Sequence, residues 1–574
     1  MSNVCVAERS VLSLRSRRRR RIRSLAFAFI AAQLAAISLA SAQTRAGGRS
    51  EVFAGSELES YLRYLQTTGK STEYPWSIRS FSPAEVDALA AVDSAHPWAA
   101  HYDLQRRQGT GGFQWDYVRP SLTFYLNSAF PYGGNDGPVW QGKGLTTSFQ
   151  GGASARWGPF SAIFAPVAFR AENQSFPLFR NGEIGRLRFA DGQFPLYLDR
   201  PQRFGILPYS RIDMGQSSVR FDGFGIAAGI STANQWWGPT DQYPFILGNN
   251  APGFPHVFLG TSHPANVWLA KLHGRIVYGE LDQSAYSSVS GPSYFASFSQ
   301  PGTRRFMAGL IGTLQPRGAP GLEIGGARFF HAANDSSGFS SHNLGLPFQN
   351  LLKSHLRRES DTTVLGGVSS LKENQLASLF LRWAPPGSGF DVYGEYGRED
   401  ANTDARDLVV EPDHSATSNL GLRKAWLSPR LMQAVRAEVF TYEAPSGTRT
   451  RGEGQIYIHG VLRQGHTNRG QLLGANVGPG SGSAQTVAYD RFTPGGRMTA
   501  FISREVQHEA TTVYTSGKPI EKAVDVMNSI GGEVTRFIGP FDVMARATLA
   551  VDLNRYFRAD QANGNFAVGV RQGF

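Results

Sequence analysis

The strongest constraint on the fold is a set of long segments in which apolar and polar side chains alternate. Between Phe541 and Leu553, apolar residues occupy every second position, and polar or small residues fill most of the others. A period of two is that of a β-strand with one apolar face. The run is about twice as long as a typical strand of about five or six residues. A tilted strand of this length can cross a bilayer, so the pattern predicts membrane-crossing strands.

The last eleven residues, 564–574, repeat this pattern. Phe566, Val568, Val570 and Phe574 share one face, and Gln572 is the one exception. In a bacterial envelope protein, an aromatic carboxy-terminal residue on such a strand indicates insertion into the outer membrane. We therefore expect an all-β transmembrane barrel in the bacterial outer membrane.

The amino-terminal residues are typical of a cleaved secretory signal. An arginine-rich stretch ending at Arg23 precedes an apolar run over 25–40, and residues 40–42 offer the small side chains that a signal peptidase needs. The apolar run is shorter than the roughly 20 residues that span a bilayer. We expect residues 1–42 to be removed after general secretion, rather than retained as an anchor.

Removal of residues 1–42 changes the charge and the thiol content. The segment contains eight Arg and one Glu, so the formal net charge falls from +12 to +5, and most of the basic excess that would favour nucleic-acid binding disappears. The single cysteine, Cys5, leaves with the segment, which excludes disulfides and thiolate metal sites. Common hydrolase, zinc-protease and phosphate-binding motifs are missing from the sequence. We expect no enzymatic activity, no cofactor and no metal.

Two regions follow the signal. Residues 43–110 predict a small helical domain, because apolar residues between Ser56 and Leu65 recur at spacings of three and four. Residues 82–85 read Ser-Pro-Ala-Glu, a capping box with proline at the first helical position. Residues 111–574 show the period of two and predict the barrel.

Tight turns and long connections alternate through residues 111–574. Several tight turns combine an aromatic residue with Gly or Pro, as at 157–160 and 537–541. Eight tight turns and nine longer connections predict about eighteen antiparallel strands. Outer-membrane barrels have an even number of strands, short periplasmic turns and long outer loops. An even count puts both chain ends in the periplasm, so we expect the helical domain to hang beneath the barrel.

Two long connections stand out chemically. In the first, adjacent Trp236 and Trp237 are followed by Asn249 and Asn250. Aromatic faces beside amide groups suit sugars, whose C–H faces stack on rings while their hydroxyls bond to amides. The structural alternative is an aromatic girdle at the membrane edge, with a rigid Gly/Pro loop filling the lumen, and the residue chemistry alone favours it.

The second connection, over 454–474, is rich in hydrogen-bond donors. Arg469 and Gln471 are its candidate glycan-binding residues, and such donors would suit an acidic polysaccharide. A folded-in loop whose polar groups bond to one another inside a wet barrel is the structural alternative.

These motifs resemble a known family. Trp-Trp-Gly-Pro at 236–239, Asn-Asn-Ala-Pro-Gly-Phe-Pro at 249–255 and Arg-Gly-Gln-Leu-Leu-Gly at 469–474 are similar to stretches of the Wzi-like capsule assembly proteins. The resemblance implies an eighteen-stranded outer-membrane barrel with a periplasmic helical bundle. It also implies a lectin that holds capsular polysaccharide at the cell surface without catalysis.

We therefore predict a surface lectin that binds an exported polysaccharide and helps to assemble or attach it. A diffusion channel is the main alternative, because it would share the barrel and differ only in an open lumen. An envelope hydrolase is a third possibility. The expected partners are the polysaccharide, outer-membrane lipids and the barrel-insertion machinery, and the barrel is expected to be a monomer that binds no nucleic acid.

Overall fold

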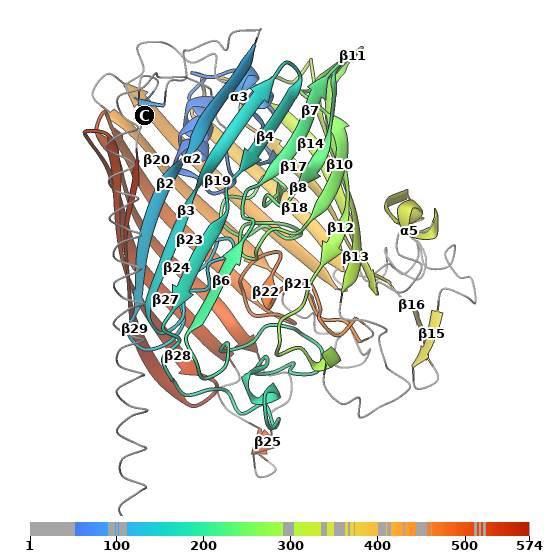
Figure 1. Cartoon of the computed structure of the whole chain (residues 1–574), viewed down its shortest axis with the longest axis vertical. Helices are drawn as coiled ribbons and strands as arrows, with labels where there is room; N and C mark the ends of the chain where they lie inside the picture. The colour runs from blue at the N-terminus through green and yellow to red at the C-terminus, as the bar shows by residue number, and fades with distance from the viewer. Residues whose placement is uncertain are drawn as a thin grey trace, which may run out of the picture. The chain divides into compact units, whose positions relative to one another are not determined.

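A computed structural model shows one closed antiparallel β-barrel (Figure 1). The structure describes residues 52–89, 98, 101–102, 112–290, 304–333, 341–348, 362–365, 368–371, 373–399, 409, 412, 415–428, 431–442, 456–460, 462–509, 514–515, 518–519 and 524–572. The predicted signal at 1–42 and the terminal Phe574 lie outside these residues. The described chain forms one compact unit that begins within the predicted helical region.

The described residues form eighteen barrel strands. The first twelve in chain order are β2 (Phe113–Asn127), β3 (Gly144–Trp157), β4 with β5 (Phe160–Phe164, Val167–Ala171), β6 with β7 (Tyr209–Asp213, Ser218–Gly223), β8 (Ile226–Ser231), β10 with β11 (His256–Thr261, Ala265–Val267), β12 (Ala270–Leu281), β13 (Arg305–Pro316), β14 (Leu322–Ala333), β17 (Glu373–Trp383), β18 (Phe390–Glu399) and β19 (Ala416–Ser428). The other six are β20 (Leu431–Thr441), β23 (Ser483–Thr493), β24 (Gly496–Glu509), β27 (Val524–Ile538), β28 (Phe541–Arg555) and β29 (Ala559–Gln572). Three strands are each interrupted, so twenty-one segments make eighteen strands, as predicted.

Several short elements are separate from the strands of the barrel wall. Four two-stranded sheets pair β1 (Ile78–Arg79) with β9 (Trp236–Trp237), β15 (Thr362–Leu365) with β16 (Val368–Leu371), β21 (Thr467–Asn468) with β22 (Gln471–Leu472), and β25 (Tyr514–Thr515) with β26 (Lys518–Pro519). The described helices are α2 (Glu57–Thr67), α3 (Pro83–Leu89), α5 (Ser341–Gly345) and the short 3₁₀ turns Leu187–Phe189, Ser288–Ser290 and Leu346–Phe348.

The carboxy-terminal strand closes the barrel. β29 pairs with β28 on one side and with β2 on the other, in a register that runs from Ser121 opposite Arg571 to Asn127 opposite Asn565. An even number of strands lets the first and last strands meet antiparallel. The alternating pattern at the end of the sequence therefore forms the seam of the barrel, which confirms the predicted fold class.

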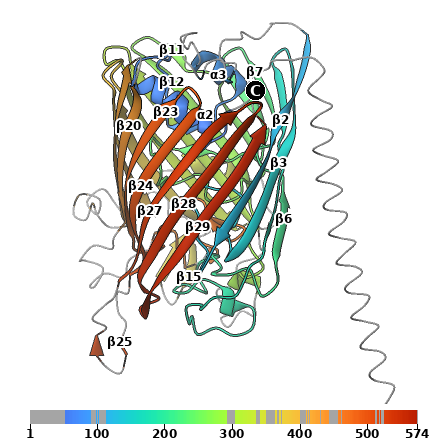
Figure 2. The same ribbon diagram turned by 90° about the vertical axis from the view of Figure 1, so that its left-hand side faces the viewer.

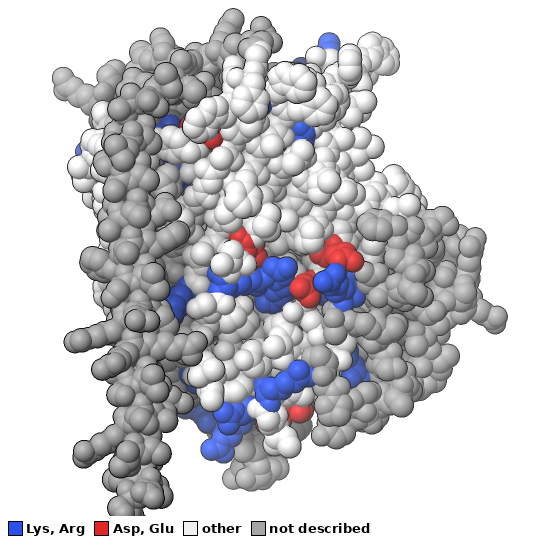
Figure 3. Space-filling view, viewed as in Figure 1, with Lys and Arg blue, Asp and Glu red and all other residues white. Residues whose placement is uncertain are grey.

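The wall is apolar outside and polar inside, as the period of two requires. On β28, Leu549 and Leu553 are 51% and 43% exposed on the outer surface, whereas Asp542 and Asp552 are buried toward the lumen. Figure 3 shows a broad part of the wall with few charged side chains, and a row of Lys, Arg, Asp and Glu lies below it in this view. An apolar band of this kind is typical of outer-membrane barrels.

Aromatic side chains surround the tight-turn end of the barrel. The turn residues Trp157, Phe160, Phe224, Trp268 and Trp383 are between 51% and 99% exposed. Aromatic rings of this kind lie at membrane–water interfaces, where their amphipathic character is satisfied. The β29 carboxy-terminus is at this same end (Figures 1 and 2), which is the periplasmic end of such a barrel.

The helices of the described amino-terminal region lie inside the tight-turn end. The capping box of α3 forms as predicted, with Ser82 N donating to Glu85 Oε2 (2.8 Å) and Glu85 N donating to Ser82 Oγ (3.3 Å). Arg63 on α2 pairs with Asp391 on β18 at 2.9 Å, and the Trp98 indole donates to the Thr493 carbonyl at 2.7 Å. The wall therefore encloses α2 and α3, which do not hang beneath the barrel as a separate body. The domain boundaries at 42/43 and 110/111 stay predictions.

Among the described helices, none combines the length and the apolar composition that a membrane-spanning helix requires.

Candidate functional site: the lumen

The Trp-Trp segment lies in the lumen because the chain leaves the wall after β8. Between Ser231 and His256 the chain turns inward, and Asn234 holds this turn. Its Nδ2 donates to the Ala251 carbonyl at 2.7 Å, and its Oδ1 accepts from Gln216 Nε2 at 3.0 Å. Gly253 passes so close to the Thr232 carbonyl that an added Cβ would lie 1.9 Å from its oxygen. The connection between β8 and β10 is therefore a lumenal loop with a fixed path.

Trp236 and Trp237 are buried in this loop, at 2% and 0% exposure. They form β9, which pairs with β1 of the amino-terminal region. The Trp236 indole donates to Thr240 Oγ1 (3.1 Å) and lies 4.8 Å from the Arg79 guanidinium group. The Trp237 indole donates to Gln235 Oε1 at 3.0 Å. Neither ring presents a face on which a sugar could stack, so the structure gives both tryptophans a packing role. Their role in glycan binding stays a prediction.

Asn249 and Asn250 join this loop to the connection between β2 and β3. Asn250 Oδ1 accepts from Asn135 N at 2.7 Å, and Asn249 Nδ2 donates to the Asn135 carbonyl at 2.8 Å. Asn250 Nδ2 also donates to the carbonyl of Gly474 at 2.5 Å, and Gly474 belongs to the second predicted connection. The two asparagines therefore hold three loops together.

Arg469 and Gln471 lie on the β21–β22 hairpin and face different surroundings. Gln471 Nε2 donates to the Asn250 carbonyl at 2.9 Å, so the two predicted segments meet at this point. The Arg469 side chain instead pairs with Asp213 at the end of β6 (3.0 Å) and with Asp282 just after β12 (3.5 Å). The structure thus brings Asn249, Asn250 and Gln471 together, and it places Arg469 against the wall.

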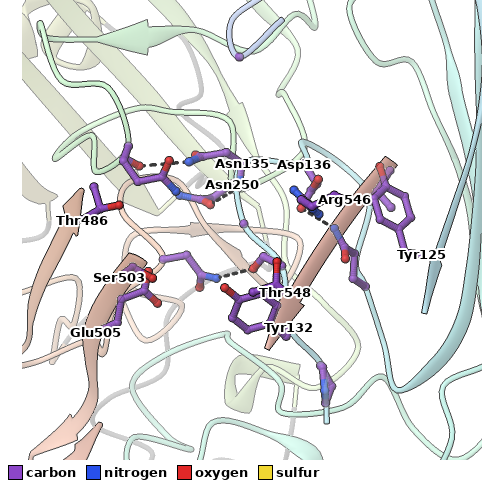
Figure 4. Close-up of a pocket in the computed structure, with 18 of the residues that line it drawn as sticks. Tyr125, Tyr132, Asn135, Asp136, Asn250, Thr486, Ser503, Glu505, Arg546 and Thr548 are labelled. Atoms are coloured by element: carbon purple, nitrogen blue, oxygen red, sulfur yellow. Dashed lines mark hydrogen bonds between the residues drawn. The ribbon is translucent and has the colours of Figure 1, made fainter. Parts of the chain in front are cut away.

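A lumenal cavity of about 650 Å³ lies beside these residues. Asn250 and Gln471 line it, together with inward-facing side chains of β20, β23, β24, β27, β28 and β29. Figure 4 shows the labelled lining residues around this space: Tyr125, Tyr132, Asn135, Asp136, Asn250, Thr486, Ser503, Glu505, Arg546 and Thr548. Its volume is in the range of small-ligand pockets.

Opposite charges alternate along the cavity toward the tight-turn end. Arg497 on β24 contacts Glu57 of α2 and Glu533 of β27, each at 2.8 Å. Asp241 of the lumenal loop contacts Arg423 at 2.8 Å and Arg436 at 2.7 Å. These ion pairs connect the lumenal loop and α2 to the wall. The cavity is therefore lined by both positively and negatively charged groups.

Burial and ion pairing set the charge state of the loop carboxyls. Burial raises the pKa of Asp241, but the guanidinium groups of Arg423, Arg436 and Arg63 outweigh it and hold the pKa well below its usual range. Burial also raises the pKa of Asp136, and there the opposing charge of Arg546 is insufficient to reverse the shift. Asp241 therefore stays ionised to a lower pH than an ordinary aspartate, whereas Asp136 takes up a proton at a higher pH than an ordinary aspartate.

Several lining atoms have no hydrogen-bond partner within the described chain. They are Asn135 Oδ1, Arg546 Nε and Thr548 Oγ1, all buried beside the cavity. Buried polar groups normally have a partner, so unpaired donors and acceptors around one cavity mark a place where a polar ligand can bind.

The sequence motifs did not identify most of this lining. Tyr132, Glu505, Arg546 and Thr548 occupy ordinary positions of strands or short connections, and only their polar character on the lumenal face distinguishes them. These residues could have been identified by selecting the polar side chains at the inward-facing positions of each strand, once the strand register was known. In the described part of the chain, no group of three or more His, Cys, Asp or Glu side chains is arranged to hold a metal.

Comparisons with known proteins agree with this architecture. The sequence profile of the family described as "Capsule assembly protein Wzi" matches residues 132–528, which is more than half of the chain. No curated protein matches the chain significantly by sequence.

Among solved structures, the chain is similar to Wzi of Escherichia coli, with 13% identity and a TM-score of 0.58. The match covers 92% of this chain and 99% of that one. Wzi of E. coli is described as an outer-membrane carbohydrate-binding β-barrel involved in group 1 capsule assembly. OccK2 of Pseudomonas aeruginosa is similar at 12% identity and a TM-score of 0.38, with 80% of this chain and 97% of that one covered. The profile match, together with the closed barrel, shows that this outer-membrane chain belongs to the Wzi capsule assembly family.

Proposed function

We propose that this protein is a non-enzymatic lectin that binds an exported polysaccharide in the lumenal cavity and holds it at the cell surface. The unpaired polar atoms of the lining carry the proposal, because a sugar supplies hydroxyl groups that donate and accept hydrogen bonds at the same time. Wzi of E. coli is itself described as a carbohydrate-binding β-barrel, which supports the same ligand class.

The chemistry of the cavity favours a polar polymer over an apolar ligand. Tyr132 donates to Ser529 Oγ at 3.1 Å, and Glu505 accepts from the Tyr243 hydroxyl at 3.1 Å, so hydroxyl and carboxylate groups point into one space. One such site would bind weakly. A repeating polysaccharide that meets many barrels in the membrane would still be retained, because linked weak contacts reinforce one another.

The test is direct binding of a short oligosaccharide, which avoids this multivalent effect. The purified protein in detergent is titrated with fragments of the surface polysaccharide of the producing cell. Gln471→Ala, Glu505→Gln and Thr548→Val should each weaken binding about tenfold, because one lost hydrogen bond costs about 1.4 kcal/mol.

Gln433→Ala is the matched control. Gln433 accepts a hydrogen bond from the Tyr489 hydroxyl (2.7 Å) on the outer wall, away from the cavity, so its loss should leave the affinity unchanged. The proposal fails if the three cavity variants bind as well as this control. An unchanged length distribution of the polysaccharide after prolonged incubation would agree with binding without cleavage.

A further inference from the structure

The outer wall has a groove where β3, β5 and β6 pair side by side. In one cross-strand row, Phe149 of β3 faces Ala168 of β5, which faces Ile212 of β6. Phe149 is 37% exposed and Ile212 is 82% exposed, and the short Ala168 lies between them. A methyl group between two large side chains leaves a channel in the surface, and the structure has a hollow of about 560 Å³ there.

A positively charged side chain lies at one end of this groove. In the next row toward the outer loops, Arg170 of β5 lies between Thr147 and Ser210, and its side chain is exposed. Lys143 is nearby at the same end, where its ammonium group donates to the Ser175 carbonyl at 3.1 Å. The groove is thus apolar along its floor and basic at its outer end.

The height of Arg170 fits the outer surface of the membrane. The strand formed by β4 and β5 begins at Phe160 in the aromatic girdle, and Arg170 is ten residues farther along. At about 3.3 Å per residue and a tilt of about 40°, ten residues rise about 25 Å, which is the height of the apolar band of such barrels. Arg170 therefore lies at the level of the outer-leaflet headgroups, with the groove among the acyl chains below it.

We propose that this groove binds a phosphorylated lipid of the outer leaflet, with one acyl chain over Ala168 and a phosphate on Arg170. An acyl chain matches the apolar floor, and phosphate is the anion that arginine recognises through paired hydrogen bonds. Glu172 lines the same hollow on the loop side of Arg170. Its carboxylate accepts from Leu145 N (3.1 Å) and Gln174 Nε2 (2.7 Å), and these hydrogen bonds offset part of its charge. The remaining negative charge opposes a phosphate, so neutralising Glu172 should favour binding.

A second outward arginine provides a matched control. Arg504 on β24 lies between Gln485 and Asn528, and the adjoining row contains the branched side chains Val487, Ile502 and Ile530. This position has the charge of Arg170 without a short side chain below it. Charge alone should not select a lipid there.

The experiment counts lipids retained by the full-length mature protein in micelles of a nonionic detergent, which carries no phosphate, by native mass spectrometry. One set of micelles contains a bis-phosphorylated, multiply acylated glucosamine disaccharide, and the other set contains its dephosphorylated form. Wild type should retain the phosphorylated lipid preferentially. Arg170→Ala should lower that retention about tenfold, to the level of the dephosphorylated lipid, because the charge-assisted hydrogen bonds are lost.

Three further variants separate the contributions. Ala168→Phe fills the groove and should lower the retention of both lipids. Glu172→Gln should raise the retention of the phosphorylated lipid. Arg504→Ala should match wild type. The proposal is overturned if Arg170→Ala behaves like Arg504→Ala, or if wild type retains both lipids equally. Because no polysaccharide is present, the result is independent of the proposed lectin function.

Discussion

The surroundings of His466 show how the lumenal loops are packed. Its Nε2 contacts the Ile246 carbonyl at 2.6 Å, and its ring stacks on Tyr457 with 5.2 Å between centroids. Burial lowers the pKa of His466 to about 3, a carbonyl contact raises it slightly, and the nearby charge of Arg305 lowers it further. The imidazole is therefore neutral in the folded protein over most of the accessible pH range.

This depressed pKa predicts a pH-dependent weakening of the loop. An unfolded histidine has a pKa of about 6.5, so the neutral buried state contributes full stability above about pH 6.5. That contribution is lost as the pH falls toward about 3. We expect amide-exchange protection of residues 467–472, corrected for intrinsic rates, to fall over this window.

His466→Gln is the control for that titration, because glutamine can donate to the Ile246 carbonyl but does not ionise. Its protection should be lower than wild type at neutral pH and should depend less on pH. An equally steep decline in the variant would assign the effect to another group, such as His331, whose ring centroid is 6.1 Å away.

At the scale of elements, the β21–β22 hairpin fills a place in the wall where strand pairing stops. β6 pairs only with β5 among the described strands, and β8 and β10 end where the lumenal loop begins. Figure 1 shows β21 and β22 between β6 and β12. The hairpin turns through Arg469 and Gly470 at φ values of 52° and 86°, as a two-residue hairpin turn requires. The Arg469 ion pairs then connect the hairpin to both sides of the opening.

This arrangement predicts that Arg469 fixes the hairpin in place. Arg469→Ala should reduce the protection of residues 467–472 by about 1 kcal/mol, because partly exposed ion pairs contribute about that much. Arg304→Ala removes an exposed arginine that pairs with Glu280 at 3.4 Å, and it should leave the hairpin unchanged. If Arg469→Ala weakened oligosaccharide binding without changing exchange, a direct ligand contact would be indicated instead.

At the scale of the whole molecule, the lumen is occupied by packed chain. Ile78 of β1, Phe245 and Leu247 of the lumenal loop, and Tyr457 and Leu472 of the later connection are all buried in one apolar cluster with inward residues of the wall. The wall supplies the outer layer of this core and the loops supply its interior. A diffusion channel needs a continuous water path, so this packing predicts a low conductance.

Conductance in planar bilayers tests this difference. The wild-type protein should give no steady large currents, and replacement of residues 233–255 by a short Gly-Ser linker should produce them. Shortening the segment that contains β25 and β26, which projects beyond the barrel end in Figures 1 and 2, should leave the membrane silent. Large steady currents from wild type would favour the channel.

Local sequence patterns are sufficient to specify the barrel. Alternation along segments such as 541–553, the aromatic tight turns, the capping box at Ser82 and the closing strand at 559–572 are local patterns. Each depends on residues a few positions apart, so the period of two and the turn chemistry were sufficient to predict about eighteen strands.

Contacts between distant segments determine what fills the barrel. Trp236 is buried because β1, from a region more than 150 residues earlier, pairs with it, and Asn250 and Gln471 meet across 221 positions of sequence. Arg469 faces the wall because β6 and β12 end at different sides of the same opening. Contacts of this kind depend on which loops compete for the lumen, and loop packing between distant segments leaves no periodic trace in the sequence.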